Sequence, residues 1–475
     1  MTVAETHPLS IGQESVWLHQ RLAPDSTAYS MAVAVRVRTP LDDALLDRAV
    51  REVARRHVLL RSVFREENGT PRRVPLSDGG APLEVRELGP VTVEELRTAV
   101  GAAHRIPFDL AAAPPWRVVL LRRTPDDAVL LLVVHHLVSD AITLWILLRE
   151  LLDAHQGLRT DGTPLLPEPV ADYQDHVTAQ RELLATPRGE RMARYWRALR
   201  ESAVPSELPT DRPRPPVQAL AGASLDLPLP AGLGERAIAA AHEAGVSVFA
   251  LLLGVFQSLV SRWTGAEETM VACLASNRTV PSARRMVGYL VNPVLLRART
   301  DRRTTWREAA VAAHHEVLQA MANVACPSAL PTGHAGSAGR GPLARLAFTL
   351  YVTDRQEPRL PYPPAGTWEG AEAEYRGLRL ALLDMPQAEG VYDLGLEVRQ
   401  TGDTLTACVR YDSTLFESAT IESFVAAYGR LAEAALSDLE APVAATALVD
   451  PAEARRLLDL GTGRAHAPLI PNPAK

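Results

Sequence analysis

Lysine is almost missing from this 475-residue chain: the only one is the last residue, Lys475, so the positive charge is essentially all arginine. Three chemistries that use a lysine side chain are therefore not expected, namely a phosphate-binding P-loop, a Schiff-base nucleophile and ATP-dependent activation of an acyl group. The formal net charge is -6, with no basic block. This balance argues against binding to nucleic acid or to an anionic membrane surface.

Cysteine is also scarce, with three residues, Cys273, Cys326 and Cys408, far apart in the chain. An odd number in apolar surroundings favours buried thiols in a reducing cytoplasm over disulfides or a zinc site, so we expect a cytoplasmic protein. Long apolar runs are lacking too, because the most apolar stretch, 129–138, contains His135 and His136. Neither a membrane span nor a signal peptide is expected.

The composition is otherwise that of a globular chain, with 47% hydrophobic and 22% charged residues. At roughly 150 residues per domain, the length allows about three domains or one large bilobed unit. Ser10, with Gln13 three residues on, has the form of a capping box and predicts a helix start. Apolar periodicity predicts a mixed α/β chain. The clearest expected helices cover 41–57, 91–104, 141–155, 247–264 and 417–436, and the clearest expected strands cover 117–121, 128–134, 270–275, 392–399 and 405–411.

Prolines crowd between residues 205 and 230, which is typical of a linker or an extended segment. The helix and strand pattern that precedes this stretch returns in type after it, although we detect no sequence repeat between the halves. We therefore divide the chain into a first α/β lobe over 1–180, a crossing over 181–230, a second α/β lobe over 231–460 and a linker over 461–475.

The sharpest local pattern is a histidine pair followed by an aspartate, His135-His136-x-x-x-Asp140, between an apolar strand and an apolar helix. Imidazole titrates near neutrality, so a histidine at a strand end can accept or relay a proton. Asp140 stands where a carboxylate caps a helix. The alternative is that Asp140 is only a cap and that both histidines are buried, satisfied polar side chains. No further ligand stands at metal-binding spacing, so no metal is expected.

Two other patterns are not expected to form catalytic sites. The pair His314-His315 lies inside an expected helix without a following aspartate, and we expect it on the solvated surface. The stretch 245–249 lacks the last glycine of a G-x-S-x-G elbow, which removes the main support for a serine hydrolase.

Ordered motifs run through the whole chain. They are Leu9-Ser10-x-x-Gln13-x-x-x-Trp17-Leu18, Arg56-His57-x-x-Leu60-Arg61-x-x-Phe64, Phe108-Asp109-Leu110, His135-His136-x-x-x-Asp140, Asp172-Tyr173, Tyr195-Trp196, the proline-rich run 208–215, Val287-Gly288-Tyr289-Leu290-Val291-Asn292 with Arg297, and the stretch 342–351. In this order they resemble the condensation domain of non-ribosomal peptide synthetases, a member of the HHxxxD acyltransferase superfamily.

The resemblance implies a fold of two chloramphenicol-acetyltransferase-like lobes, arranged as a V-shaped pseudo-dimer with a central tunnel. It also implies partners. A donor carrier protein, and for some acceptors a second one, would deliver substrates on phosphopantetheine arms, with no cofactor bound covalently to this chain. The linker resembles one that leads to an adenylation domain; such a neighbour and a free-standing enzyme both stay open, and a monomer is the expected state.

The resemblance also assigns roles to residues. His136 is the catalytic candidate, since the second histidine of the motif faces the tunnel in this family. His135 and Asp140 complete the motif, with Asp140 chiefly structural and ion-paired to an arginine. Arg278 is our first choice for that partner and Arg61 the second.

Three residues are expected to line the tunnel, Ser139, Ala141 and Asn292. Ala141 departs from the family, which usually has glycine there, and adds a methyl group beside the expected path of the pantetheine arm. The sixth motif of the family is only weakly represented, by the stretch 323–327. Its donor-side role is therefore not carried over.

The expected function is amide formation between a carrier-bound acyl or peptidyl thioester and an aminoacyl or amine acceptor. Three alternatives stay open: ester formation, an acyl-CoA-dependent acyltransferase of the same superfamily, and a catalytically silent module that recruits carrier proteins or a tailoring enzyme. The acyl-CoA group is disfavoured because its late D-F-G-W-G motif is missing. The silent module is disfavoured by the intact His136 and favoured by Ala141.

Overall fold

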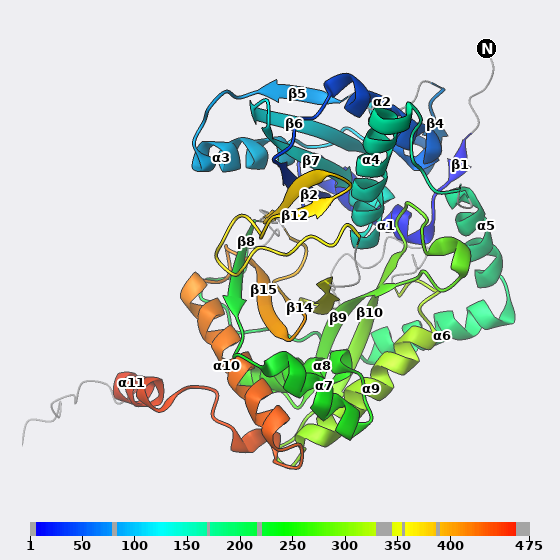
Figure 1. The fold of residues 1–475 in the computed structure, drawn as a ribbon. Coiled ribbons are helices and arrows are strands. Elements are labelled where there is room, and N and C mark those ends of the chain that lie inside the picture. The colour runs from blue at the N-terminus through cyan, green and yellow to red at the C-terminus, as the bar shows by residue number, and fades with distance from the viewer. Residues whose placement is uncertain are drawn as a thin grey trace, which may run out of the picture.

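Two six-stranded sheets form the framework of the computed structural model (Figure 1). The structure describes residues 6–77, 83–168, 172–215, 221–328, 344–353, 357–385 and 390–461. Residues 462–475 of the expected C-terminal linker, and 342–343 of the last motif, lie outside these ranges. The first sheet has the order β12 (Ala373–Tyr375), β13 (Leu378–Leu383), β2 (Ser30–Val37), β7 (Asp127–His135), β6 (Trp116–Thr124) and β5 (Glu84–Glu87).

The centre of the first sheet is β7, which pairs antiparallel with β2 on one side and β6 on the other. All but its first residue are buried, which confirms the prediction of a central strand from its apolar sequence. The helices of this lobe are α1 (Ile11–Leu22), α2 (Asp43–Arg56), α3 (Val93–His104), α4 (Ala141–Asp161) and α5 (Tyr173–Leu184), and a small sheet has the order β1 (His7–Pro8), β4 (Thr70–Pro75) and β3 (Ser62–Glu67).

The second sheet begins with an antiparallel pair and continues with a parallel connection. Its order is β10 (Val291–Arg299), β9 (Glu268–Ser276), β11 (Leu346–Val352), β14 (Leu394–Thr401), β15 (Thr404–Asp412) and β8 (Gly222–Pro228). The helices of this lobe are α7 (Leu233–Ala244), α8 (Val248–Thr264), α9 (Trp306–Ala322) and α10 (Ser418–Ser437). They gather on one side of the sheet, and the first lobe lies on the other (Figure 1).

Local signals in the sequence place the starts of α1 and α4 correctly, although α4 continues to Asp161, beyond the predicted end at residue 155. The capping box predicted at Ser10 is present, because the Ser10 hydroxyl accepts from the Gln13 amide and the Gln13 side chain accepts from the Ser10 amide. Asp140 caps α4 by accepting from the amide of Thr143. These bonds satisfy amides that the first turn of a helix leaves free.

The structure differs from the predicted domain boundaries in two places. The stretch 181–230 holds a sixteen-residue helix, α6 (Pro187–Ser202), and strand β8, which pairs with β15. The hairpin of β12 and β13, from within 231–460, joins the first sheet by pairing with β2. Its two-residue turn, Arg376–Gly377, has positive φ angles of 49° and 76°, as a tight hairpin turn requires.

The hairpin is also tied to the first lobe through side chains. Tyr375 donates a hydrogen bond of 2.8 Å to the Asp153 carboxylate of α4, and Arg376 forms an ion pair with the same carboxylate. The lobes are thus connected by main-chain pairing as well as by packing.

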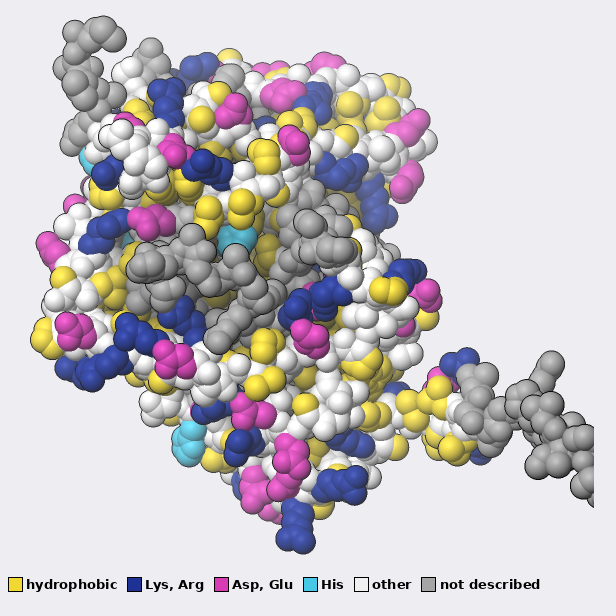
Figure 2. Space-filling model, turned by 180° about the vertical axis from the view of Figure 1, so that it is seen from behind, with side chains coloured by type: hydrophobic (Ala, Val, Ile, Leu, Met, Phe, Trp, Pro, Cys, Tyr) yellow, Lys and Arg dark blue, Asp and Glu magenta, His cyan; other side chains and the backbone are white. Residues whose placement is uncertain are grey.

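The surface shows two further features. Figure 2 shows arginine and acidic side chains intermingled over the rear face. The last helix, α11 (Pro451–Gly461), stands away from the body in Figure 1. Within the described residues no single helix is long and apolar enough to cross a membrane; α7 and α8, bent by 98°, pass such a test only as a pair, by length and composition.

Candidate active site

The histidine motif lies at the end of β7, where the strand gives way to a short 3-10 turn (His136–Val138) and then to α4. The strand is buried and paired on both sides, and α4 is capped by Asp140. The six residues of the motif are therefore held between two rigid elements.

His135 is a buried structural residue in this arrangement, with 1% of its surface exposed. Its Nδ1 accepts from the Leu137 amide at 3.1 Å, so Nε2 carries the proton and donates to Gln20 Oε1, also at 3.1 Å. Burial, and then the neighbouring His136, lower its pKa from 6.5 to about 3. His135 is thus neutral, with both ring nitrogens in use.

His136 is half-buried and uses only one ring nitrogen. Its Nδ1 lies 2.7 Å from the carbonyl oxygen of Ser139, and because a carbonyl only accepts, Nδ1 carries the proton. Among the described residues no group hydrogen-bonds Nε2. Burial lowers the pKa of His136, against the Ser139 carbonyl and the charge of Asp140, which raise it. The result is a neutral imidazole with a lone pair on Nε2.

Two tyrosine rings flank the His136 imidazole, one from each lobe. Tyr29 precedes β2; its ring centroid is 6.4 Å from that of His136, and its carbonyl accepts from the His136 amide at 2.7 Å. Tyr289 precedes β10 in the second lobe, and its centroid is 5.3 Å from His136. His136 therefore lies where the two lobes meet.

Asp140 is the centre of a buried joint between the lobes. Arg278 Nη2 donates to both carboxylate oxygens, at 2.8 and 2.9 Å. The amides of Thr143 and Leu290 also donate to this carboxylate. The side chains of Asp140 and Arg278 are 1% and 5% exposed, so the ion pair is shielded from water.

The joint extends through Thr143 and Gly288. The Thr143 hydroxyl donates to the Gly288 carbonyl at 3.0 Å and lies 3.2 Å from the Gly288 amide. A side chain at Gly288 would place its Cβ 2.3 Å from the ring of Tyr173, so only glycine fits. The Tyr173 hydroxyl in turn donates to the Tyr289 carbonyl at 2.9 Å.

Only one of the two arginines proposed from the sequence as partners of Asp140 contacts it in the structure. Arg278, the first choice, contacts Asp140 and also donates to the carbonyls of Ala283 and Met286. Arg61, the second choice, donates instead to the carbonyl of Leu76. Arg61 is therefore not the partner of Asp140.

The three residues expected to line a tunnel have different surroundings. Ala141 is exposed at the first position of α4. Ser139 is buried, and its hydroxyl donates to the His135 carbonyl at 3.0 Å. Asn292 is 3% exposed, and its amide donates to the carbonyl of Val324, in the turn that weakly represents the sixth motif.

Sequence reasoning named Tyr289 only as part of the motif 287–292, without a place at the site, and missed Tyr29, Thr143 and Gly12. Gly12 has no side chain where Tyr289 packs: a Cβ there would lie 2.4 Å from Tyr289 Cε1. Glycine early in a helix is the one signal that could have marked this approach. Tyr29 and Thr143 have no local signal, because their roles arise from contacts with residues far away in the sequence.

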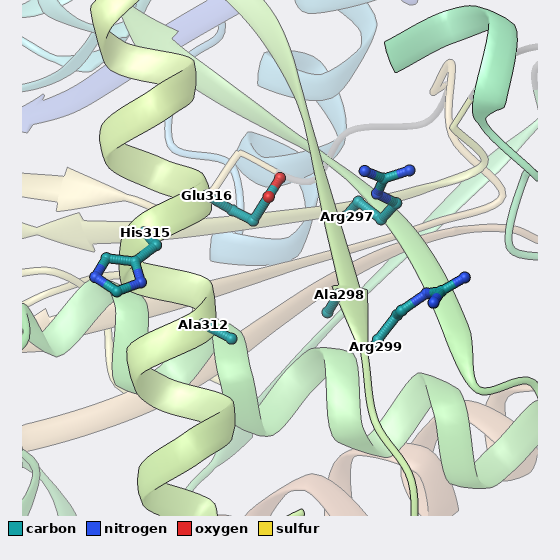
Figure 3. Close-up of a pocket in the computed structure, with 6 residues that line it drawn as sticks. All are labelled: Arg297, Ala298, Arg299, Ala312, His315 and Glu316. Atoms are coloured by element: carbon teal, nitrogen blue, oxygen red, sulfur yellow. The ribbon is translucent and has the colours of Figure 1, made fainter. Parts of the chain in front are cut away.

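A surface pocket of about 590 Å³ lies elsewhere, between β10 and α9 (Figure 3). It is lined by Arg297, Ala298, Arg299, Ala312, His315 and Glu316. His315 is exposed there, as expected for the second histidine pair, while His314 is partly buried. In the part of the chain that the structure describes, no group of three or more His, Cys, Asp or Glu could hold a metal ion.

Comparison with known proteins gives one consistent result. The family model described as "Condensation domain" matches residues 3–458. A linear gramicidin synthase of Brevibacillus parabrevis is 28% identical over 95% of this chain, and phosphinothricin tripeptide synthetase PhsB of Streptomyces viridochromogenes is 30% identical, also over 95%. The chain spans 9% and 38% of the lengths of these relatives.

Solved structures are similar in fold. The X-domain from teicoplanin biosynthesis has a TM-score of 0.81 at 22% identity, covering 94% of this chain and 99% of that one. The first condensation domain of the calcium-dependent antibiotic synthetase, in complex with substrate analogue 3a, has a TM-score of 0.75 at 21% identity and covers the same shares. The two lobes have the chloramphenicol-acetyltransferase-like fold that the motifs predict.

Proposed function

This chain belongs to the condensation-domain family of non-ribosomal peptide synthetases, and from that premise we propose that it joins a carrier-bound acyl or peptidyl thioester to an amine through an amide bond. The observation that carries the proposal is His136. Its Nδ1 proton is fixed on the Ser139 carbonyl, and its Nε2 has no hydrogen-bonding partner in the described ranges. A neutral imidazole at the lobe interface is suited to receive the proton of an attacking amine.

In the proposed reaction the amine nitrogen attacks the thioester carbonyl carbon. The Nε2 lone pair accepts a hydrogen bond from the amine, orients the amine's own lone pair toward the carbonyl and takes up the proton released as the C–N bond forms. The C–S bond then breaks, and the proton passes to the pantetheine sulfur. Binding both substrates in one geometry supplies much of the rate gain in such a reaction.

Asp140 holds the geometry of this site and does not take part in the proton transfer. Its carboxylate is engaged by Arg278 and by the amides of Thr143 and Leu290, which fix the start of α4 against the second lobe. His136 is only four residues away. A shift at this joint would therefore move the imidazole.

The substrates would arrive on phosphopantetheine arms of carrier proteins, through a tunnel between the lobes. Ala141 is exposed at the start of α4, one residue after the cap and close in sequence to His136. This position is consistent with a role beside the arm. An adjacent adenylation domain as a partner and action as a monomer belong to the same proposal.

The test is amide formation from a loaded donor carrier protein and an amine acceptor, measured for the wild type and for His136→Ala. His315→Ala is the matched control, because His315 is exposed on α9, apart from the motif. We expect product from wild type and control, and a rate lower by about 100-fold or more for His136→Ala. Equal rates for all three would contradict the role of His136.

A silent recruitment module is the second candidate, favoured by Ala141 in place of the usual glycine. It predicts binding of a loaded carrier protein by the wild type without product, and product after Ala141→Gly if the methyl group alone blocks the arm. Product formation by the wild type would rule it out.

A further inference from the structure

Two tyrosine rings flank His136, a third tyrosine lies within electrostatic reach of these two, and the histidine motif contains none of the three. Tyr29 comes from the first lobe, while Tyr289 and Tyr392 come from the second. Burial raises the pKa of all three, and for two of them neighbouring phenols add to the increase. Tyr289 is influenced by Tyr29 and Tyr392, and Tyr392 by Tyr29, which places the hydroxyls within electrostatic reach of one another.

None of the three hydroxyls has a hydrogen-bond partner among the described residues, whereas those of Tyr428 and Tyr173 do. The Tyr428 hydroxyl donates to the Leu252 carbonyl, and the Tyr173 hydroxyl to the Tyr289 carbonyl. Because no protein acceptor in the described residues takes these protons, each hydroxyl can still donate a hydrogen bond to a bound ligand. Burial raises the pKa of Tyr29 to about 12 and raises that of Tyr289 and Tyr392 as well, so all three keep their protons.

Tyr289 is the most firmly held of the three, and its ring lies closer to His136 than that of Tyr29. Its carbonyl accepts from the Tyr173 hydroxyl, its ring fills the space left by Gly12, and its centroid lies 5.3 Å from the imidazole. A side chain fixed in this way costs little reorganisation when charge develops beside it.

We propose that the Tyr289 hydroxyl donates a hydrogen bond to the thioester carbonyl oxygen as that oxygen becomes negative, with the Tyr29 ring also flanking His136. This inference rests on the proposed amide-forming function. When the amine attacks, the electron pair of the carbonyl bond moves to oxygen. Tyr289 stabilises that oxyanion until the pair returns and expels the pantetheine sulfur, while His136 carries the proton from nitrogen to sulfur. The phenol keeps its own proton throughout.

The variant Tyr289→Phe removes the hydroxyl and keeps the ring that packs on His136. We expect kcat to fall about 100-fold, the usual effect of losing one oxyanion donor, with KM and melting temperature unchanged. Tyr195→Phe is the matched control: Tyr195 is half-buried on α6, and its hydroxyl also has no partner in the described part of the chain. An unchanged kcat in Tyr289→Phe, with an active wild type, would overturn the inference and leave the proposed function standing.

A second measurement does not depend on turnover. A pantetheine-linked phosphonate carries negative oxygens on a tetrahedral centre, and a pantetheine-linked amide is planar and neutral. We expect Tyr289→Phe to weaken phosphonate binding at least 10-fold more than amide binding, and Tyr195→Phe to change neither. That result with an inactive wild type would support the oxyanion role and contradict the proposed function. Equal losses for both ligands, or none, would overturn the oxyanion role.

Discussion

The joint around Asp140 and the tyrosine-flanked site at His136 both include residues of the short stretch 135–140, but their polar groups are used differently. At the joint, four hydrogen bonds from Arg278, Thr143 and Leu290 end on one buried carboxylate. At His136, the Nε2 atom and the hydroxyl of the neighbouring Tyr289 have no hydrogen-bond partner within the described residues. Groups satisfied inside the protein hold it together, and groups left open can bind and stabilise a reacting substrate.

The largest effect should come from breaking the joint. Asp140→Ala leaves the Arg278 guanidinium buried without its carboxylate, and we expect the free energy of unfolding to fall by about 3–5 kcal/mol. Urea unfolding followed by circular dichroism measures this. The control Arg55→Ala breaks an exposed ion pair with Glu52 and should cost less than about 1 kcal/mol. Equal losses in the two variants would show that the joint is not a stabilising feature.

A smaller loss of stability, with a clear loss of activity, should follow from filling the space beside Tyr289. In Gly12→Ala the new Cβ would lie 2.4 Å from Tyr289 Cε1, so the ring must move away from its place on His136. We expect about 1–3 kcal/mol of destabilisation and a fall in the rate of amide formation at a temperature where the variant stays folded. Gly395→Ala is the control, since its Cβ would meet no atom closer than 3.8 Å. Full activity in Gly12→Ala would contradict a role for the position of the Tyr289 ring in the reaction.

The smallest effect should be a change in the pH dependence of stability. The pKa of His135 is about 3 in the folded protein and near 6.5 when unfolded, so between these values the unfolded chain binds more protons. Stability is then lost as pH falls below 6.5, by at most about 1.4 kcal/mol per pH unit from this group. We expect His135→Gln, which can still donate to Gln20, to show a shallower fall between pH 6.5 and 5. The same slope in both proteins would contradict a buried, neutral His135.

These expectations rest partly on features that the sequence predicts and partly on features that only the fold creates. Strand β7, helix α4 and the Asp140 cap follow from local patterns. Burial of a strand on both faces and capping of a helix each depend on residues that are close together in the sequence. No local pattern in the sequence distinguishes Arg278 from the other arginines as the partner of Asp140; the contact between the two side chains is seen only in the structure.

The pairing of two tyrosine rings with His136 could not be predicted in the same way. Tyr29 and Tyr289 are 260 residues apart, and they meet at His136 only because the lobes pack together. The return of the β12–β13 hairpin to the first sheet likewise depends on pairing with β2, a contact with no local signature. Residues that act through long-range contacts are the ones that sequence patterns leave out.

The central claim is that His136 presents an unprotonated Nε2 to the space between the lobes. The most direct measurement is the nitrogen NMR spectrum of the protein with labelled histidine, with the His136 signals assigned by their loss in His136→Gln. We predict a proton on Nδ1 and none on Nε2 at pH 7, persisting as the pH is lowered to 6.5, since the pKa of His136 lies below its usual value. A proton on Nε2 at pH 7 would contradict the account.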